Sequence, residues 1–263
     1  MDIIVCVKRV PDTARAEVKI AEDGRRIREE GLVFDMNDWD KYAVEEAVRL
    51  KEKYGGTVTA IALGPEGVED ILRRCFVIGC DEGIRLTDKA FEGSDAATTA
   101  RILHRVIRGM KFDLLLTGAQ ASDDGYGQVG PTLAGLLGIP HAVLVTRIEI
   151  LDGKARVDCE LEGGLAEVVE IKLPAVLTIQ TGIKEPRYIS IRALVKAAQK
   201  ETKVINREGL GMREEEVGEA GSKTRIERLF LPPVTKEMQI LPSEPGEAAT
   251  GLIEILKDKG VLV

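Results

Sequence analysis

The chain has few of the residue types from which active sites and metal sites are usually built. Its 263 residues include two histidines and four cysteines, and aromatic residues make up 4% of the sequence. The cysteines are scattered in apolar patterns without a C-x-x-C pair, which favours reduced, buried thiols in a cytoplasmic protein. The motifs G-x-S-x-G, G-x-x-x-x-G-K and H-E-x-x-H are absent. The sequence therefore predicts no catalytic residue and no metal ligand, as is typical of a binding or carrier subunit.

The sequence also lacks long apolar runs and an excess of basic residues. No hydrophobic stretch reaches the roughly 20 residues of a membrane-spanning helix, so we expect no membrane insertion. The net charge of −7 argues against nucleic acid and anionic membrane surfaces as partners. Residues 3–7 are apolar but have neither a basic segment before them nor a cleavage site after them. We interpret them as a first core strand.

Apolar residues, at 44% of the chain, are sufficient for one large domain or two small ones. Over the first 140 residues, short apolar strands alternate with amphipathic helices. This order predicts an α/β fold with a mostly parallel, Rossmann-like sheet and helices on both faces. The predicted strands are 3–7, 57–63, 84–86 and 113–117, and the helices start at Asn37 or Asp38, at 68, at Ser94 or Asp95, and near Gly127.

The pattern changes after Pro140, where three strands separated by glycine turns predict an antiparallel extension. These strands are 143–150, 155–161 and 165–173, and a buried strand at 175–180, an exposed loop at 182–188 and a helix at 191–200 follow. Residues 201–263 are polar and glycine-punctuated, with a final helix near 248–256. We expect residues 1–200 to form a nucleotide-binding domain. The remaining arm is too long to bury itself on that domain, so we expect it to pack on a partner subunit.

The stretch 112–130, FDLLLTGAQASDDGYGQVG, combines a strand, a polar loop and a helix start. The unpaired N–H groups and dipole of a helix start favour a bound anion, so this stretch is the predicted nucleotide site. Residues 125–130 match G-x-G-x-x-G, but seven residues, 118–124, separate Thr117 from Gly125, whereas the dinucleotide motif directly follows its strand. Asp123 and Asp124 would repel a pyrophosphate, and we interpret them as helix caps. The alternative is a solvated loop without a ligand.

Four segments resemble the beta subunit of electron transfer flavoprotein: VCVKRVPDT, MNDWDKYAVEEAVRLKEKYGG, LLLTGAQASDDGYGQVGPTLAGLLG and LPAVLTIQTGIKEPRYISI. They occur in the family's order, with similar spacing, from Met1 to about Lys200. The resemblance implies a heterodimer whose alpha subunit holds most of an FAD, and a beta subunit that binds a nucleotide. The nucleotide contacts that it implies are Cys6, Asn37, Asp38, Trp39, Asp40, Leu63, Gly118, Ala119, Gln120, Ala121, Ser122, Asp123, Asp124, Gly125, Tyr126, Gly127, Gln128 and Val129.

The resemblance also implies a loop by which the beta subunit docks onto redox partners. Those partners are acyl-CoA or other dehydrogenases, with a quinone oxidoreductase or ferredoxin as the further partner. An apolar residue on an exposed loop is physically suited to such docking. The residues of this predicted docking loop are Glu185, Pro186, Arg187, Tyr188 and Ile191.

Two alternatives concern the nucleotide itself, which is AMP or a second FAD. The segments VPDT and QVGP are more similar to an anaerobic branch in which FAD replaces AMP and an electron pair from NADH is bifurcated. They favour FAD, and NADH oxidation is expected only in that case.

Two further alternatives belong to other functional classes. An NAD-dependent oxidoreductase would need an acidic residue at the end of the next strand, where Glu149 is a poor candidate. A small nucleotide-binding stress or signalling protein would have no use for the long arm.

Overall fold

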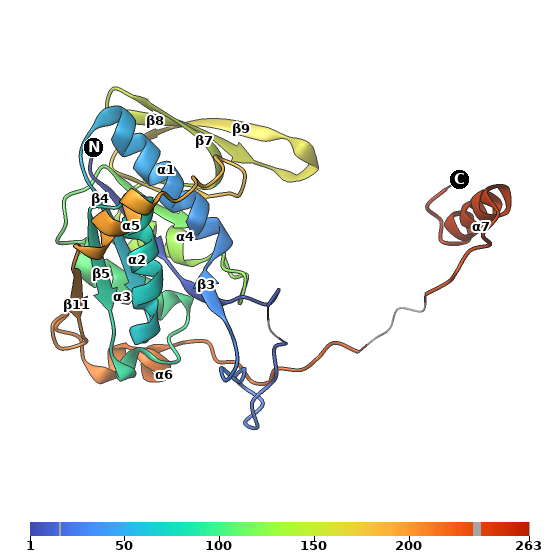
Figure 1. The fold of residues 1–263 in the computed structure, drawn as a ribbon, viewed down its shortest axis with the longest axis horizontal. Helices are drawn as coiled ribbons and strands as arrows, with labels where there is room; N and C mark the ends of the chain where they lie inside the picture. The colour runs from blue at the N-terminus through green and yellow to red at the C-terminus, as the bar shows by residue number, and fades with distance from the viewer. Residues whose placement is uncertain (16, 234–237, 263) are drawn as a thin grey trace. The chain divides into compact units, whose positions relative to one another are not determined.

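A computed structural model describes residues 1–15, 17–233 and 238–262 of the chain (Figure 1). The chain divides into two compact units, Met1–Glu227 and Arg228–Val263. The first unit contains a nine-stranded sheet with helices, and the second contains one helix, α7 (Pro245–Asp258). No helix among the described residues is long and apolar enough to cross a bilayer.

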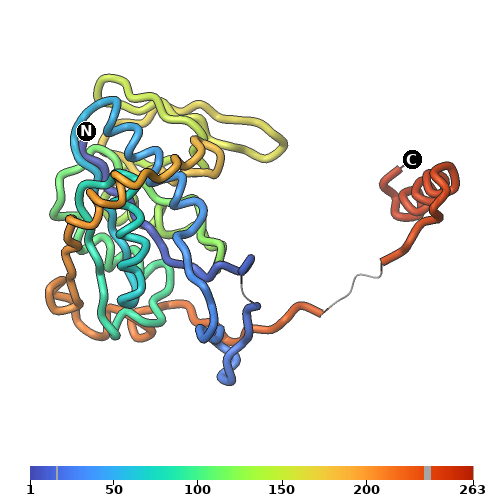
Figure 2. The backbone as a smooth tube through the Cα atoms, in the orientation of Figure 1, coloured from blue at the N-terminus to red at the C-terminus, as the bar shows by residue number. Residues whose placement is uncertain are grey.

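The sheet is parallel over most of its width and antiparallel at one side. Parallel pairing extends from β11 to β7, whereas β8 pairs antiparallel with both β7 and β9. In Figure 2 the yellow part of the tube, which carries β8 and β9, projects as a hairpin from the parallel part. The predicted fold class is confirmed. From edge to edge the strands are β11 (Thr202–Ile205), β5 (Glu82–Leu86), β4 (Val58–Leu63), β1 (Ile3–Val7), β6 (Leu114–Gly118), β10 (Ala175–Ile179), β7 (His141–Leu151), β8 (Lys154–Glu160) and β9 (Ala166–Lys172).

Helices cover both faces of the parallel strands because successive side chains of each strand point to opposite faces. In β1, Ile3, Val5 and Val7 belong to the core cluster that includes α1 (Asp38–Tyr54) and α2 (Glu69–Ile78). Ile4 and Cys6 belong to the cluster that includes α3 (Ala96–Ile107) and α4 (Val129–Leu137). Full burial of a large apolar side chain contributes about 2 kcal/mol, so these two cores are the main source of stability.

Strand β1 lies where the order of the sheet reverses. The chain passes from β1 to β4 and then β5 on one side, and later returns to place β6 on the other side of β1. In open α/β sheets the helices diverge at such a reversal and leave a crevice outside the carboxyl ends of the strands. The carboxyl ends of β1 and β6 are followed by Lys8 and Ala119, respectively.

The segment after β1 contains an element that the sequence did not predict. This element is β2 (Arg9–Pro11), which pairs antiparallel with β3 (Phe34–Met36). Farther along this segment, Asp23 and Gly24 lie in a turn, and Ile20 and Ile27 form a β-bridge across it. Pro11 fits because both strands of a two-stranded ribbon are edge strands, where proline is tolerated.

Residues 201–227 belong to the first unit and not to a separate arm. Strand β11 pairs with β5 at the sheet edge, and Leu210, Met212 and Val217 are buried in the cluster with α3. The structure therefore places the boundary between its two units after Glu227, 27 residues later than the predicted boundary after Lys200. Packing of the arm on a partner subunit stays a prediction. The remaining elements are the helices α5 (Ile191–Ala198) and α6 (Gly218–Gly221) and the 3₁₀ helices η1 (Glu66–Val68), η2 (Lys89–Phe91), η3 (Glu162–Gly164) and η4 (Glu214–Glu216).

Candidate functional site

The polar loop after β6 is held against the start of α1 by the side chain of Asn37. Its amide nitrogen donates to the carbonyl of Gln120 at 2.8 Å, and its amide oxygen accepts from the backbone N–H of Ser122 at 3.1 Å. Asn37 occupies the N-cap position of α1, but its side chain makes no capping hydrogen bond. The predicted start of α1 at Asn37 or Asp38 is confirmed, but the Asn37 side chain does not cap the helix, because the loop uses both of its polar atoms.

Asp40 joins the carboxyl ends of β1 and β6. One carboxyl oxygen accepts from the backbone N–H of Lys8 at 2.7 Å, and the other accepts from that of Gly118 at 3.0 Å. Burial raises the pKa of Asp40 to about 7, against the lowering effect of these hydrogen bonds. Burial and the nearby Asp40 raise the pKa of Cys6 to about 12. Cys6, in β1, is therefore a neutral thiol.

Two glycines allow the close packing on which this site depends. A Cβ on Gly118 would collide with the Asp40 carboxylate and lie 2.7 Å from the Cβ of Trp39. A Cβ on Gly130, in the first turn of α4, would lie 2.5 Å from the Thr178 side chain of β10. The indole N–H of Trp39 donates to Gln180, just after β10, at 2.7 Å. The starts of α1 and α4 are thus fixed directly against the strand ends.

The acidic pair of the loop binds a lysine and does not cap α4. The ammonium of Lys8 lies 2.7 Å from the Asp123 carboxylate and 2.8 Å from that of Asp124. Burial lowers the pKa of Lys8, but these hydrogen bonds outweigh it and raise the pKa above the usual lysine value. The N-cap residue of α4 is Gln128, so the capping prediction for the acidic pair is wrong. Lys8 offsets one of the two negative charges that would oppose a phosphate.

The start of α4 has the properties of an anion site. In the part of the chain that the structure describes, no side chain caps this helix. Its first-turn N–H groups, those of Val129 and Gly130, are therefore free to donate to a ligand. Gly125 and Gly127, with φ of 65° and 61°, shape the approach to the helix in a left-handed conformation that glycine adopts readily.

Electron transfer flavoprotein subunits are prominent among the known proteins similar to this chain. The family model described as "Electron transfer flavoprotein domain" matches residues 25–209. The electron transfer flavoprotein subunit beta of Methylophilus methylotrophus is 36% identical over 262 residues, which is 98% of each chain. That of Bacillus subtilis is 36% identical over the full length of both chains. The caffeyl-CoA reductase-Etf complex subunit CarD of Acetobacterium woodii is also 36% identical over both full lengths.

The chain belongs to the electron transfer flavoprotein beta subunit family. The prediction made from the four sequence segments is confirmed. A role as a beta subunit in flavoprotein electron transfer, with a partner subunit, follows from this membership.

The residues that the family resemblance assigns to the nucleotide mostly lie together. Residues 118–129 and the start of α1 meet at the carboxyl ends of β1 and β6, whereas Leu63 ends the neighbouring β4 and is half-buried. Asp38 pairs with Lys41 at 2.7 Å. Sequence reasoning missed Lys8, although its position directly after β1 places it at the same sheet edge. Nucleotide binding by these residues stays a prediction.

The predicted docking residues of this beta subunit form a separate surface. Arg187 binds Glu45 and Glu52 of α1, with N–O distances of 3.0 and 2.6 Å. Tyr188 is fully exposed and Ile191 is 79% exposed. An aromatic and an aliphatic side chain with such high exposure are available to another protein.

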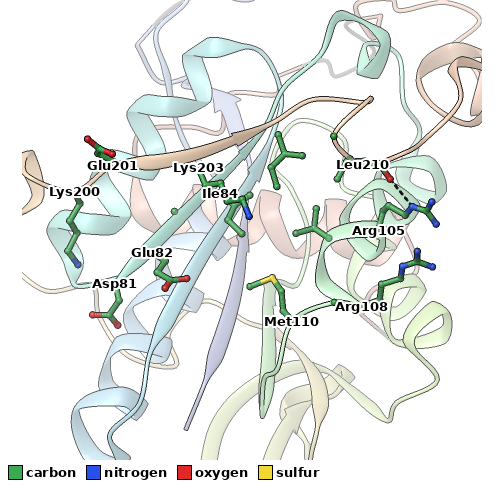
Figure 3. Close-up of a pocket in the computed structure, with 15 residues that line it drawn as sticks. Asp81, Glu82, Ile84, Arg105, Arg108, Met110, Lys200, Glu201, Lys203 and Leu210 are labelled. Atoms are coloured by element: carbon green, nitrogen blue, oxygen red, sulfur yellow. Dashed lines mark hydrogen bonds between the residues drawn. The ribbon is translucent and has the colours of Figure 1, made fainter.

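A cavity of ≈ 860 Å³ lies elsewhere, near the amino end of β5 (Figure 3). Its lining carries both signs of charge, with the acidic Glu82 and Glu201 and basic residues that include Arg108 and Lys203. None of the residues predicted to bind the nucleotide or to form the docking loop, all of which the structure describes, lines it. We therefore place the candidate site at the carboxyl ends of β1 and β6 and not in this cavity.

Proposed function

We propose that this beta subunit binds an adenine nucleotide at the carboxyl ends of β1 and β6 and works in a heterodimer whose alpha subunit holds most of an FAD. The uncapped start of α4, at the point where the sheet order reverses, carries this proposal. Asn37 and Asp40 hold the loop and strand ends around it. When bound, FAD supplies the reversible electron transfer, and this chain supplies binding and orientation.

The residues present fit a nucleotide phosphate. The N–H groups of Val129 and Gly130 would donate hydrogen bonds to the phosphate oxygens. Pro131 has no N–H group, but it lies in the first turn of the helix, where it leaves these two donors in place. Gly125 and Gly127 keep side chains away from the continuing pyrophosphate. Lys8 offsets the charge of Asp123 and Asp124, so the loop repels the anion less than its sequence suggests.

We favour FAD over AMP as the nucleotide of this subunit, and with it an electron-bifurcating, NADH-linked complex. The VPDT and QVGP segments motivate this choice. Tyr126, the side chain that could fill the space beyond an adenylate, is 58% exposed. A flavin needs that space, whereas AMP does not.

The flavin content of the purified heterodimer tests both parts of the proposal. The nucleotides are released by acid, separated by chromatography and quantified against protein. Two FAD per heterodimer is the expected result. One FAD with one AMP would exclude the bifurcating form and leave the simple electron carrier, and a heterodimer without any nucleotide beyond one FAD would refute the site in this subunit.

We also propose that dehydrogenases dock on the surface formed by residues 185–191 and α5. Ile191, Leu194 and Val195 follow helical spacing and are 79%, 50% and 62% exposed. Exposed apolar side chains at this spacing suit an apolar groove on a partner.

Replacing the most exposed of these residues tests the docking surface. Ile191→Asp should raise the KM for the dehydrogenase by about tenfold or more, because it would place a charge in an apolar contact. The flavin content should stay at the wild-type value. An unchanged KM would place docking elsewhere.

A further inference from the structure

The proposed docking surface is exposed, yet both of its flanks are attached to the rest of the first unit. Before it, Ile183 is buried in the core cluster that contains α1 and α2. After it, Ala197 is buried in the same cluster, and the ammonium of Lys200 donates to the carbonyl of Cys80. Residues 184–190 have no helix or strand of their own. A further contact within them is needed to fix their position.

Arg187 provides that contact. Its backbone N–H and its side chain both donate to the Glu45 carboxylate, with distances from 3.0 to 3.2 Å. The two terminal nitrogens of its guanidinium donate to the two oxygens of Glu52 at 2.6 and 3.1 Å. Glu45 and Glu52 lie two turns apart on α1. One planar side chain thus bridges two carboxylates of a rigid helix, and lysine cannot reproduce this fork of donors.

Burial makes this contact different from an ordinary surface ion pair. The side chain of Glu45 is fully buried and that of Arg187 is 29% exposed. A buried carboxylate needs its partners, whereas exposed pairs contribute little. Glu45 has one other cationic partner, Arg49 on the same helix at 2.6 Å, among the ion pairs of the described residues. Because Arg49 lies on α1 itself, its ion pair with Glu45 does not attach the loop to the helix. Arg187 is the contact that attaches the loop to α1.

We propose that Arg187 is a positioning residue of the docking surface and not a direct contact of the dehydrogenase. By holding the loop on α1, it presents Tyr188 and Ile191 in a fixed arrangement to an apolar groove of the partner. A surface ordered in advance loses less conformational freedom when the partner binds. This inference depends on the proposed docking function, but the contact with α1 can be measured without any partner.

The test compares Arg187→Ala with Arg49→Ala in the complete heterodimer. Both variants remove an arginine from Glu45, but only the first releases the loop. For Arg187→Ala we expect at least about tenfold faster amide hydrogen exchange in residues 184–192. We also expect a KM for the dehydrogenase raised by about tenfold at an unchanged kcat, because docking and not chemistry is affected. Arg187→Lys should recover only part of both effects, and Arg49→Ala should match the wild type.

Glu52→Gln provides a milder variant in case Arg187→Ala does not fold. Glu52 is 54% exposed, so this change removes one half of the bridge without leaving a buried charge unpaired. It should shift exchange and KM in the same direction by smaller factors.

Three results would overturn the proposal. Unchanged exchange and unchanged KM in Arg187→Ala would show that the bridge does not order the loop. A raised KM with unchanged exchange would show that Arg187 contacts the partner directly. Faster exchange with an unchanged KM would show that the order of the loop does not affect docking of the dehydrogenase. In that last case, Ile191→Asp identifies the failure, because an unchanged KM in that variant as well would refute the docking surface itself.

Discussion

At the scale of single residues, the site depends on polar side chains whose partners are distant in sequence. The family resemblance predicted that Asn37 and Asp40 lie near the nucleotide. Their hydrogen bonds to Gln120, Ser122 and Gly118 could not be predicted, because the partners are about 80 residues away and are brought close only by the pairing of β1 with β6. The local sequence favoured a capping role for Asn37 at the start of α1, but its side chain instead forms hydrogen bonds with the distant loop.

The buried Asp40 should make the stability of the subunit depend on pH. The folded protein holds the proton up to about pH 7, whereas the unfolded chain releases it near pH 3.8. The folded state therefore binds more protons between these values, and the free energy of unfolding contributed by this group falls as pH rises from about 4 to 7. Asp40→Asn cannot titrate and should lack this decrease.

Denaturant unfolding of the wild type and Asp40→Asn at several pH values measures this effect. The stability advantage of the wild type should shrink between pH 5 and pH 7.5. Asp23→Asn is a suitable control because Asp23 lies in an exposed turn. Parallel pH profiles for the wild type and Asp40→Asn would contradict the prediction.

Loss of Asp123 should loosen the polar loop and reduce nucleotide occupancy. Asp123→Ala removes one of the two carboxylates that bind Lys8. Because this pair is partly exposed, the stability loss should not exceed about 1 kcal/mol. The nucleotide retained after extensive dialysis is the measurement, with Asp23→Ala as the exposed ion-pair control. Full occupancy at wild-type thermal stability would exclude a role for Asp123.

At the scale of elements, the sequence pattern predicted the buried strands and most helices, but not the short edge strands. Residues 202–205 lie in a polar segment, and their strand exists because β5 offers an unpaired edge. Residues 9–11 contain a proline and pair only with three residues of β3. Neither segment has enough apolar periodicity for a strand to be predicted from its own sequence. In contrast, the continuous apolar run of β1 reflects burial on both faces of the sheet, and the apolar stripes of α1 to α3 reflect packing of these helices on the sheet.

The position of α4 can be tested with two glycines of the same helix. Gly130→Ala would push the helix start away from Thr178 and Thr117, which should cost about 1 to 3 kcal/mol and lower nucleotide occupancy. Gly135 is exposed, and a Cβ there meets nothing within 4 Å. Gly135→Ala should therefore be neutral or stabilise by up to about 1 kcal/mol. Equal thermal stability and nucleotide content in both variants would refute the close contact at Gly130.

At the scale of the whole molecule, the chain consists of a sheet domain, Met1–Glu227, followed by an arm, Arg228–Val263. Phe230, Leu231, Met238 and Ile240 are 65% to 88% exposed. Four large apolar side chains exposed on one short segment are typical of a surface that another chain covers. The sequence predicted such an arm, but it placed the arm's start too early because the fold of residues 201–227 depends on contacts with α3 and β5.

Removal of residues 228–263 should separate folding from assembly. The truncated subunit should keep the secondary structure and thermal transition of the first unit, because the two units have separate internal contacts. Its affinity for the alpha subunit should fall by at least about tenfold, measured by sedimentation or titration of the two purified subunits. A truncated chain that binds the alpha subunit as tightly as the full chain would refute the role of the arm.

The place of β11 in the chain has a consequence for biosynthesis. It is the last strand of the nine-stranded sheet to be translated, and only η4, α6 and their connections separate it from the arm. Every strand of the sheet has therefore been synthesised before the arm leaves the ribosome, and domains generally fold in this vectorial order. The predicted binding of the arm to the alpha subunit would therefore come after the synthesis of every strand of the sheet.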